Sequence, residues 1–331
     1  MGIKHLNKYF IEKCSNLAIH KIGFDELQHQ TIIVDVSIYL YKFTERGSFL
    51  ENMYLFISMF REYGIVPVFV FDGKPPPEKK DLLEKRKTDK LIAETKYAEI
   101  KHRISSMESI DVRKDIDEME ELKKQFVRLN ERDIRDAKML TDCYGVNYIE
   151  SNGEADQLCA YLVKNGYAWG CMSDDMDMFL YGCPRVIRHV SLMNHTAVVY
   201  DTARILRELD MPFADFKDAL ILSGTDYNIH AGDEHEVNIM TTMQWYERYR
   251  YSNNPHISNR LSFYDWLEGN TDYLRDRAKL DTVYNMFDLA AYAETNKDFI
   301  SNIKSSMVPF KNKLIQMSKL KELMMGDGFI F

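Results

Sequence analysis

The sequence predicts an α/β protein with a mainly parallel sheet covered by helices on both faces. Continuous apolar segments rich in β-branched and aromatic residues, typical of buried parallel strands, occur at 31–35, 66–73 and 167–175. Helical patterns alternate with them, which indicates strand–helix–strand units. All three expected strands end in aspartate. Because ligands of open parallel sheets bind beyond the carboxyl ends of the strands, this acidic edge is a candidate site.

The helices expected between the strands have different characters. Residues 48–64 and 155–166 are amphipathic, and the second segment ends at a glycine. Residues 78–142 contain no proline and are dense in charged residues, with Leu, Ile and Met at roughly helical spacing. Two interpretations stay open, a solvated helical hairpin with i,i+4 ion pairs and a mobile helical lid over the acidic edge; composition alone favours the first.

Composition limits the protein classes. The 331 residues carry a net charge of −8 and five cysteines without a CxxC pair, which favours reduced thiols inside a cell over a disulfide framework or zinc site. No membrane span or signal peptide is expected. The acidic charge argues mildly against nucleic acid, but residues 74–114 hold 12 Lys or Arg against 8 Asp or Glu. A polyanionic ligand therefore remains possible.

The chain after Asp226 changes character. Residues 243–267 are crowded with Tyr, Trp and Arg, and the last ninety or so residues have helical patterns separated by loops. Aromatic and basic residues interleaved in this way form either a base-stacking surface or, more often, a helical core.

Acidic side chains near strand ends and in nearby turns are the candidate metal ligands. An isolated aspartate at such a position is more often a turn residue or helix cap. If all of them converge, repulsion requires hard divalent cations, and an all-oxygen set selects Mg²⁺ or Mn²⁺. Two such ions suit phosphodiester hydrolysis. The candidates are Asp35, Asp72, Glu154, Asp156, Asp175, Asp177 and Asp226.

Several motifs, in order, resemble the structure-specific 5′ nucleases of the flap-endonuclease/XPG family over about residues 1–230. The matching stretches are MGIKHL, IIVDVSIYLYKF, VPVFVFDGKPP, EKKDLLEKR, GEADQLCAYLVKNG, SDDMDMFLYG and LSGTDY. The resemblance implies a PIN-like 5′-nuclease core at 1–230, with a helical arch or lid inserted at 78–130. The C-terminal region at 231–331 is expected to be helical. Its helix–two-turn–helix departs from the Gly-rich family pattern and keeps one glycine, Gly232.

The resemblance also implies roles for individual acids. It places a first metal site on Asp35, Asp72, Glu154 and Asp156, and a second on Asp175, Asp177 and Asp226. Asp174 takes a non-ligand position and is expected to tolerate substitution better. Spacing of i,i+2 in an extended segment agrees, because it places Asp175 and Asp177 on one side.

Basic and aromatic residues complete the implied site. Lys79 and Arg86 match a catalytic, substrate-binding basic pair beside the scissile phosphate, and two helical turns separate them. Tyr41 matches an aromatic residue that stacks on a base; otherwise it is a helix-core tyrosine. Gly2, in the first matching stretch, joins the substrate-binding set. The catalytic set is Lys79, Arg86, Asp35, Asp72, Asp175 and Asp177.

The expected function is two-metal Mg²⁺-dependent cleavage of DNA at 5′ flaps or junctions, with 5′-exonuclease activity, in replication or repair; Mn²⁺ can substitute. The alternatives are a 5′→3′ exonuclease on nicked or gapped DNA or RNA, and an inactive nucleic-acid-binding scaffold. We expect a monomer, located in a nucleus or a cytoplasmic viral replication site. The tail MGDGFIF lacks a clamp-binding box.

Overall fold

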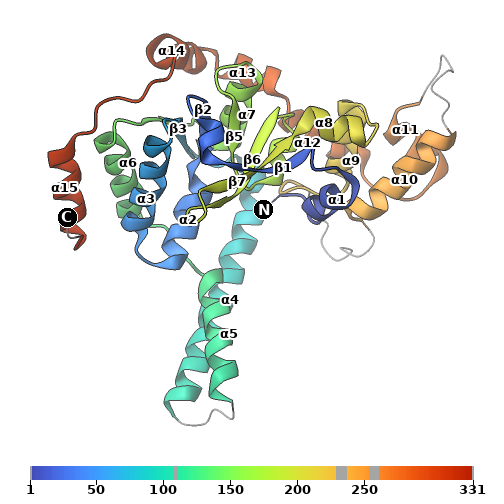
Figure 1. The fold of residues 1–331 in the computed structure, drawn as a ribbon. Coiled ribbons are helices and arrows are strands. Elements are labelled where there is room, and N and C mark those ends of the chain that lie inside the picture. The colour runs from blue at the N-terminus through green and yellow to red at the C-terminus, as the bar shows by residue number, and fades with distance from the viewer. Residues whose placement is uncertain (1, 107–110, 229–236, 253–260, 330–331) are drawn as a thin grey trace.

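The structure, a computed structural model, describes residues 2–106, 111–228, 237–252 and 261–329. These residues form one seven-stranded sheet in the order β1-β7-β6-β5-β2-β3-β4 (Figure 1). The strands are β1 (Ile19–Gly23), β2 (Thr31–Asp35), β3 (Val66–Phe71), β4 (Asn147–Glu150), β5 (Gly170–Met172), β6 (Arg185–Ser191) and β7 (Thr196–Asp201).

The middle of the sheet is parallel, as the sequence predicts. Strands β6, β5, β2, β3 and β4 run parallel, whereas β7 is antiparallel to both of its neighbours, β6 and β1. The expected fold class is confirmed, with this antiparallel addition. The strands expected at 66–73 and 167–175 are shorter, ending at Phe71 and Met172. The residues that follow them leave the sheet in loops, and those loops carry the acids.

Helices cover both faces because successive residues of the central strands point to opposite sides. Ile32 and Val34 belong to one apolar core, and Ile33 belongs to the other. The first core includes residues of α2 (Val36–Arg46), α3 (Phe49–Glu62), α6 (Glu131–Cys143) and α15 (Met317–Gly326). The second core includes residues of α1 (Leu6–Lys13), α7 (Ala155–Lys164), α9 (Phe213–Leu222) and α10 (Ile239–Ser252).

A helical hairpin projects away from this body (Figure 1). It consists of α4 (Lys80–Ser105) and α5 (Val112–Gln125), which pack through a small core of Ala93, Ile100 and Leu122. An ion pair between Arg103 and Asp115 joins the two helices. The apolar residues at helical spacing in this charged segment therefore pair two helices into a hairpin.

The remaining described helices lie mainly in the C-terminal third of the chain. The aromatic residues Tyr246, Tyr249 and Phe263 are buried in the second core, so for these three residues the core interpretation is correct. Among the described helices, none has both the length and the apolar composition needed to cross a bilayer. The helices not yet named are α8 (Thr202–Glu208), α11 (Phe263–Asn270), α12 (Arg277–Met286), α13 (Leu289–Thr295) and α14 (Lys297–Met307).

Candidate functional site

The carboxyl end of β2 connects two groups of acids. Asp35, the last residue of β2, is buried and its Oδ2 accepts a hydrogen bond from the Ser173 hydroxyl at 2.9 Å. The same hydroxyl accepts a hydrogen bond from the backbone N–H of Asp175 at 3.1 Å. Ser173 was not among the residues expected from the sequence. It links the end of β2 to the loop that follows β5.

A close backbone approach positions Asp72 beside the start of α7. Gly73 donates its N–H to the carbonyl of Gly153 at 2.8 Å, and a Cβ on Gly73 would lie 2.0 Å from the Ser151 carbonyl oxygen. Only glycine allows this approach. Asp72 then accepts a hydrogen bond from the backbone N–H of Ala155 at 2.8 Å, at the N-terminus of α7. Its carboxylate is thereby held next to the helix turn that contains Glu154 and Asp156.

Asp175 and Asp177 are brought together by a turn and not by an extended segment, which corrects the expected local structure. Asp175 caps the 3₁₀ helix η3 (Met176–Phe179), and its Oδ1 accepts from the Asp177 N–H at 3.0 Å. A Cβ on Gly2 would lie 2.5 Å from Oδ1 of both residues. The two oxygens therefore flank one point, and Gly2 fits there because it lacks a side chain and has φ of +74°.

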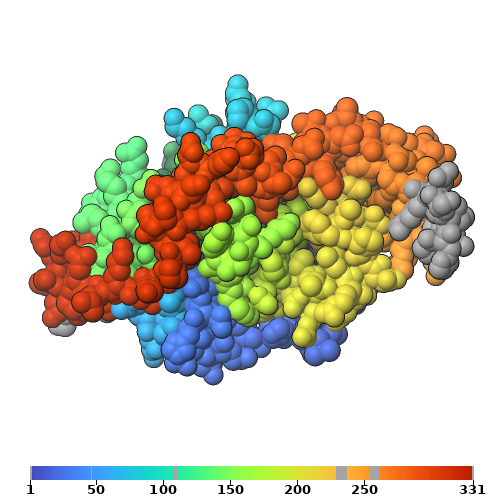
Figure 2. Space-filling view, turned by 90° about the horizontal axis from the view of Figure 1, so that it is seen from above, coloured from blue at the N-terminus to red at the C-terminus, as the bar shows by residue number. Residues whose placement is uncertain are grey.

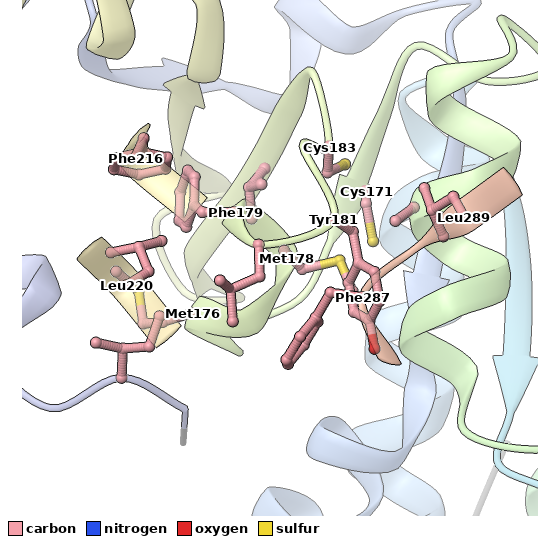
Figure 3. Packing of buried hydrophobic residues seen from close by; sticks show 14 of the residues in the cluster. Cys171, Met176, Met178, Phe179, Tyr181, Cys183, Phe216, Leu220, Phe287 and Leu289 are labelled. Atoms are coloured by element: carbon pink, nitrogen blue, oxygen red, sulfur yellow. The ribbon is translucent and has the colours of Figure 1, made fainter. Parts of the chain in front are cut away.

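Apolar side chains on both sides of this turn fix its position (Figure 3). Met176, Met178 and Phe179 are almost completely buried and pack in the second core. Phe179 meets Phe10 edge-to-face with ring centroids 5.0 Å apart. The apolar residues that flank Asp177 in the sequence therefore anchor the turn in the core and fix the position of its carboxylate.

A compact turn after α9 presents Asp226. The Asn228 side chain accepts from the backbone N–H and hydroxyl of Thr225 and donates to the carbonyl of Ile221. This network fixes the loop between α9 and Asp226. The seventh acid is therefore held by polar contacts, whereas Asp175 and Asp177 are held by apolar packing.

Two cations meet the acids at the base of the hairpin. The Lys79 ammonium lies 2.5 Å from Glu154 Oε1 and 3.8 Å from Asp226 Oδ2, and Arg86 donates to the same Asp226 oxygen at 2.9 Å. Lys79 lies at the end of the short helix η2 (Pro77–Lys79) and not within α4. The sequence predicts that both basic side chains point the same way. In the structure both reach the same oxygen of Asp226, although they come from different helices.

Burial and mutual repulsion change the protonation of the cluster. Burial, followed by the charge of Asp72, raises the pKa of Asp35 to about 8. Burial and neighbouring acids raise the pKa values of Asp156 and Asp177 well above the usual range. Burial alone would lower the pKa of Lys79, but the charge of Glu154 raises it above its ordinary value. Without a further cation, the cluster is therefore stabilised by bound protons and by Lys79.

The acids fit a hard divalent cation by their chemistry. The donor set is entirely oxygen, and Asp177 Oδ1 is a buried carboxylate oxygen with no hydrogen-bond partner. Within the described ranges, however, no three His, Cys, Asp or Glu side chains are close enough together to form a ready-made metal site. The ammonium of Lys79 lies among these acids, in contact with Glu154 and Asp226.

Asp174 has a different environment. It forms an ion pair with Lys42, and its Oδ1 accepts from the backbone N–H of His189 at 2.9 Å. The buried Arg188 donates to the Asp174 carbonyl at 3.0 Å. Asp174 thus joins the helix α2 to strand β6. The sequence offered no signal for this structural role, because its partners are distant in the chain.

Tyr41 and Tyr227 complete the surroundings of the site. Tyr41 is 45% exposed, so it is not a helix-core residue, and Lys90 lies 5.4 Å from its ring centroid. Tyr227 donates its hydroxyl to Glu154, and its ring lies 5.0 Å from the Lys79 ammonium. Tyr227 was missed at the level of sequence, although it belongs to the LSGTDY motif.

The sheet, the acids at its carboxyl edge and the projecting helical hairpin define an α/β protein of the PIN-like 5′-nuclease fold class. Solved structures have the same fold. The catalytic core of Rad2 in complex with a DNA substrate aligns with 99% of this chain and 96% of its own, with a TM-score of 0.64 at 16% identity. The flap endonuclease-1 of Methanococcus jannaschii gives a TM-score of 0.55 at 19% identity, over 93% of this chain and 97% of its own.

Sequence comparisons identify the family. The XPG N-terminal domain matches residues 1–93, and the XPG I-region matches residues 145–226. Flap endonuclease 1 of Glycine max is 32% identical over 246 residues, which is 69% of this chain and 62% of the relative. That of Methanococcus aeolicus is 30% identical, over 63% of this chain and 66% of its own. The chain belongs to the flap-endonuclease/XPG family, and it spans less than two thirds of these relatives' lengths.

Proposed function

We propose that the chain is a metal-dependent DNA endonuclease that cleaves 5′ flaps or junctions, with an accompanying 5′-exonuclease activity, in replication or repair. The observation that carries this proposal is the gathering of seven acids and two basic residues at one edge of the sheet. Six of the acids lie at the end of β2, after β3 and β5, or at the start of α7. Burial and neighbouring acids raise the pKa values of Asp35, Asp156 and Asp177, and perturbed pKa values are typical of functional sites.

The acids would hold two Mg²⁺ ions, or Mn²⁺ in their place. Asp35, Asp72, Glu154 and Asp156 form the proposed first site, and Asp175, Asp177 and Asp226 form the second. When bound, such ions lower the pKa of a water nucleophile and stabilise the attacking and leaving oxygens. Because metal ligands must be deprotonated, binding would release the protons that burial retains on Asp35 and Asp177.

The chain's own cations would orient the substrate. Lys79 and Arg86 share Asp226 as a partner, so both would lie beside a phosphodiester bound at the metal site that Asp226 would complete. Positive charge fixed at this place would stabilise the charge that develops on the phosphate. Tyr41 is sufficiently exposed to stack on a base beside them.

We further propose that the α4–α5 hairpin is the lid expected at 78–130. Lys79 and Arg86 lie at its base, so ordering of the hairpin by substrate would set the positions of both cations. The division at residue 230, the monomeric state and the intracellular replication site also remain predictions. The single glycine Gly232 lies outside the described residues.

Cleavage products from labelled nucleic acids test the activity. The full chain is incubated with 5′-labelled flap, nicked, gapped and blunt DNA and with single-stranded RNA, in Mg²⁺, Mn²⁺ or chelator. Release of an intact flap supports the endonuclease, whereas release of mononucleotides alone from nicks, gaps or RNA supports the 5′→3′ exonuclease. If no substrate gives a metal-dependent product, the chain is a binding scaffold and the enzymatic proposal is wrong.

A pair of variants tests the site. Asp177→Ala should lower the cleavage rate at least about 100-fold while substrate binding in chelator is retained. Asp298→Ala is a matched control, because this exposed aspartate lies on α14 and outside the acidic edge. Cleavage by Asp177→Ala at the rate of the control would refute the assignment of Asp177 as a ligand.

A further inference from the structure

Strand β4 forms one edge of the sheet, and the chain around α14 contacts it near both ends: beyond its end, Asn152 donates to the Asn296 side chain at 3.1 Å. The segment after α14 crosses near the beginning of the strand, where Lys313 donates its N–H to the Gly145 carbonyl at 2.8 Å. The Asn147 side chain donates to the Lys311 carbonyl at 2.8 Å. Beyond Asn147, no strand among the described residues pairs with the outer side of β4. Figure 2 shows the red C-terminal chain crossing the surface toward α15.

One hydrogen bond shows which backbone groups of β4 face β3 and which face outward. Ser151 donates its N–H to the carbonyl of Phe71 in β3 at 2.9 Å. Since successive residues of a strand turn their N–H and C=O groups to opposite sides, Tyr148 and Glu150 direct theirs away from β3. No backbone group of the described residues pairs with these outward groups, so they can pair with another extended chain.

A groove of about 630 Å³ lies along this edge. Strand β4, the helix α14 and the crossing segment form its walls. Its apolar lining includes Ile149, Phe299 and Met307, and such surfaces can receive alternate side chains of an added strand. The groove therefore combines an open backbone edge with apolar subsites.

The charges of the groove indicate which extended chain would fit. Lys311 and Lys313 line it, are exposed, and form no ion pair with any residue in the described part of the chain. Glu150, at the end of β4, is already paired with Lys138 at 2.9 Å, so Asp142 is the remaining acid in the lining. The two lysines thus favour a partner with acidic residues opposite them, whereas the acids disfavour a nucleic-acid backbone.

We propose that this groove is a docking site for an extended peptide segment of a partner protein, in which apolar and acidic residues alternate. The peptide adds to β4 as an eighth strand, places its apolar side chains against α14, and pairs its acids with Lys311 and Lys313. This interaction surface lies outside the acidic site and does not depend on the proposed cleavage activity. It would allow a partner to be bound while the substrate site stays accessible.

A labelled peptide tests the proposal on the full chain. The probe is a fluorescein-labelled eight-residue peptide in which valine or isoleucine alternates with glutamate, and fluorescence anisotropy measures its binding. We expect a Kd of the order of 10 μM, and at least tenfold weaker binding by a peptide methylated on alternate backbone nitrogens. Hydrogen exchange should slow at Tyr148 and Glu150 when the peptide is bound.

Charge reversal supplies the matched variants. The double variant Lys311→Glu, Lys313→Glu should bind the acidic probe at least tenfold more weakly and bind a lysine-containing counterpart more tightly. Lys297→Glu is the control, because this exposed lysine is outside the groove. The proposal is wrong if no peptide binds at 500 μM or if the double variant binds like the control. It is also wrong if the β4 amides become protected by self-association as the protein concentration rises.

Discussion

Replacement of Gly2 is the most direct test of the geometry at the second proposed metal site. In Gly2→Ala, the new Cβ would lie 2.5 Å from an oxygen of Asp175 and an oxygen of Asp177. These distances are well inside van der Waals contact, so the carboxylates or the chain near Gly2 must move. A positive φ for a residue with a Cβ adds about 1–2 kcal/mol of strain. In a chain of this size, that strain lowers Tm by no more than about 3 °C.

The effect on cleavage should be much larger than the effect on stability. Displacement of catalytic groups by about 1 Å lowers rates about 100-fold. We therefore expect kcat on a 5′-flap substrate to fall about 100-fold and the Mg²⁺ concentration for half-maximal rate to rise, with KM little changed. The assay is a Mg²⁺ titration of single- and multiple-turnover cleavage, with Tm measured in parallel.

Gly153→Ala is the matched control for this prediction. Gly153 lies in the loop before α7, and a Cβ there would meet nothing within 4 Å. Its cleavage rate should stay within about threefold of the original. If Gly2→Ala keeps the original kcat and Mg²⁺ requirement, the reasoning from steric contact is refuted. If it raises KM alone, Gly2 acts in substrate binding, as the family resemblance implied.

Three further variants address neighbouring features. Tyr227→Phe removes the hydroxyl that donates to Glu154 and should lower cleavage about tenfold and raise the Mg²⁺ requirement, measured by the same titration; an unchanged requirement contradicts this role. Asp174→Asn weakens the contacts to buried Arg188 and should lower the free energy of unfolding by about 1–3 kcal/mol in urea, with less than tenfold loss of activity; unchanged unfolding would disprove the structural role. Burial, followed by the charge of Asp215, raises the pKa of Asp218 to about 7 in the folded protein. Between about pH 4 and pH 7 the folded protein therefore keeps a proton that the unfolded chain loses, so the contribution of Asp218 to the free energy of unfolding falls as the pH rises. Asp218→Asn should remove this decline, which is about 1 kcal/mol per pH unit. Urea unfolding in the presence of chelator, from pH 5 to 8, measures it, and an unaltered dependence of stability on pH would contradict the prediction.

The central strands could be predicted because their composition is determined by burial on both faces. Strand β2 has the bounds expected from the sequence, 31–35. Strands β6 and β7 were not expected, because they are partly exposed and carry mixed polar and apolar residues without a long apolar run. The antiparallel pairing of β7 depends on partners far away in the chain, and no local pattern encodes it.

The acids of the site were accessible to sequence reasoning, but the contacts that orient them were not. Strand ends and motif order indicated the seven carboxylates. Ser173 lies 138 residues from Asp35, and Tyr227 lies 73 residues from Glu154, so only tertiary structure reveals these hydrogen bonds. The turn that joins Asp175 to Asp177 also escaped prediction, because spacing of i,i+2 fits both an extended segment and a capped 3₁₀ turn.

The position of α15 has a consequence for how the protein is synthesised. Leu320 and Met324 of α15 are buried in the same core as Phe56 of α3 and Phe69 of β3. After the ribosome has synthesised all seven strands, the nascent chain still lacks α15, which covers part of the sheet face that packs against α3. Until residue 324 has emerged from the ribosome, that face stays partly open to solvent and to chaperones. Deletion of α15 should therefore reduce the yield of folded protein, even though it removes none of the seven candidate acids.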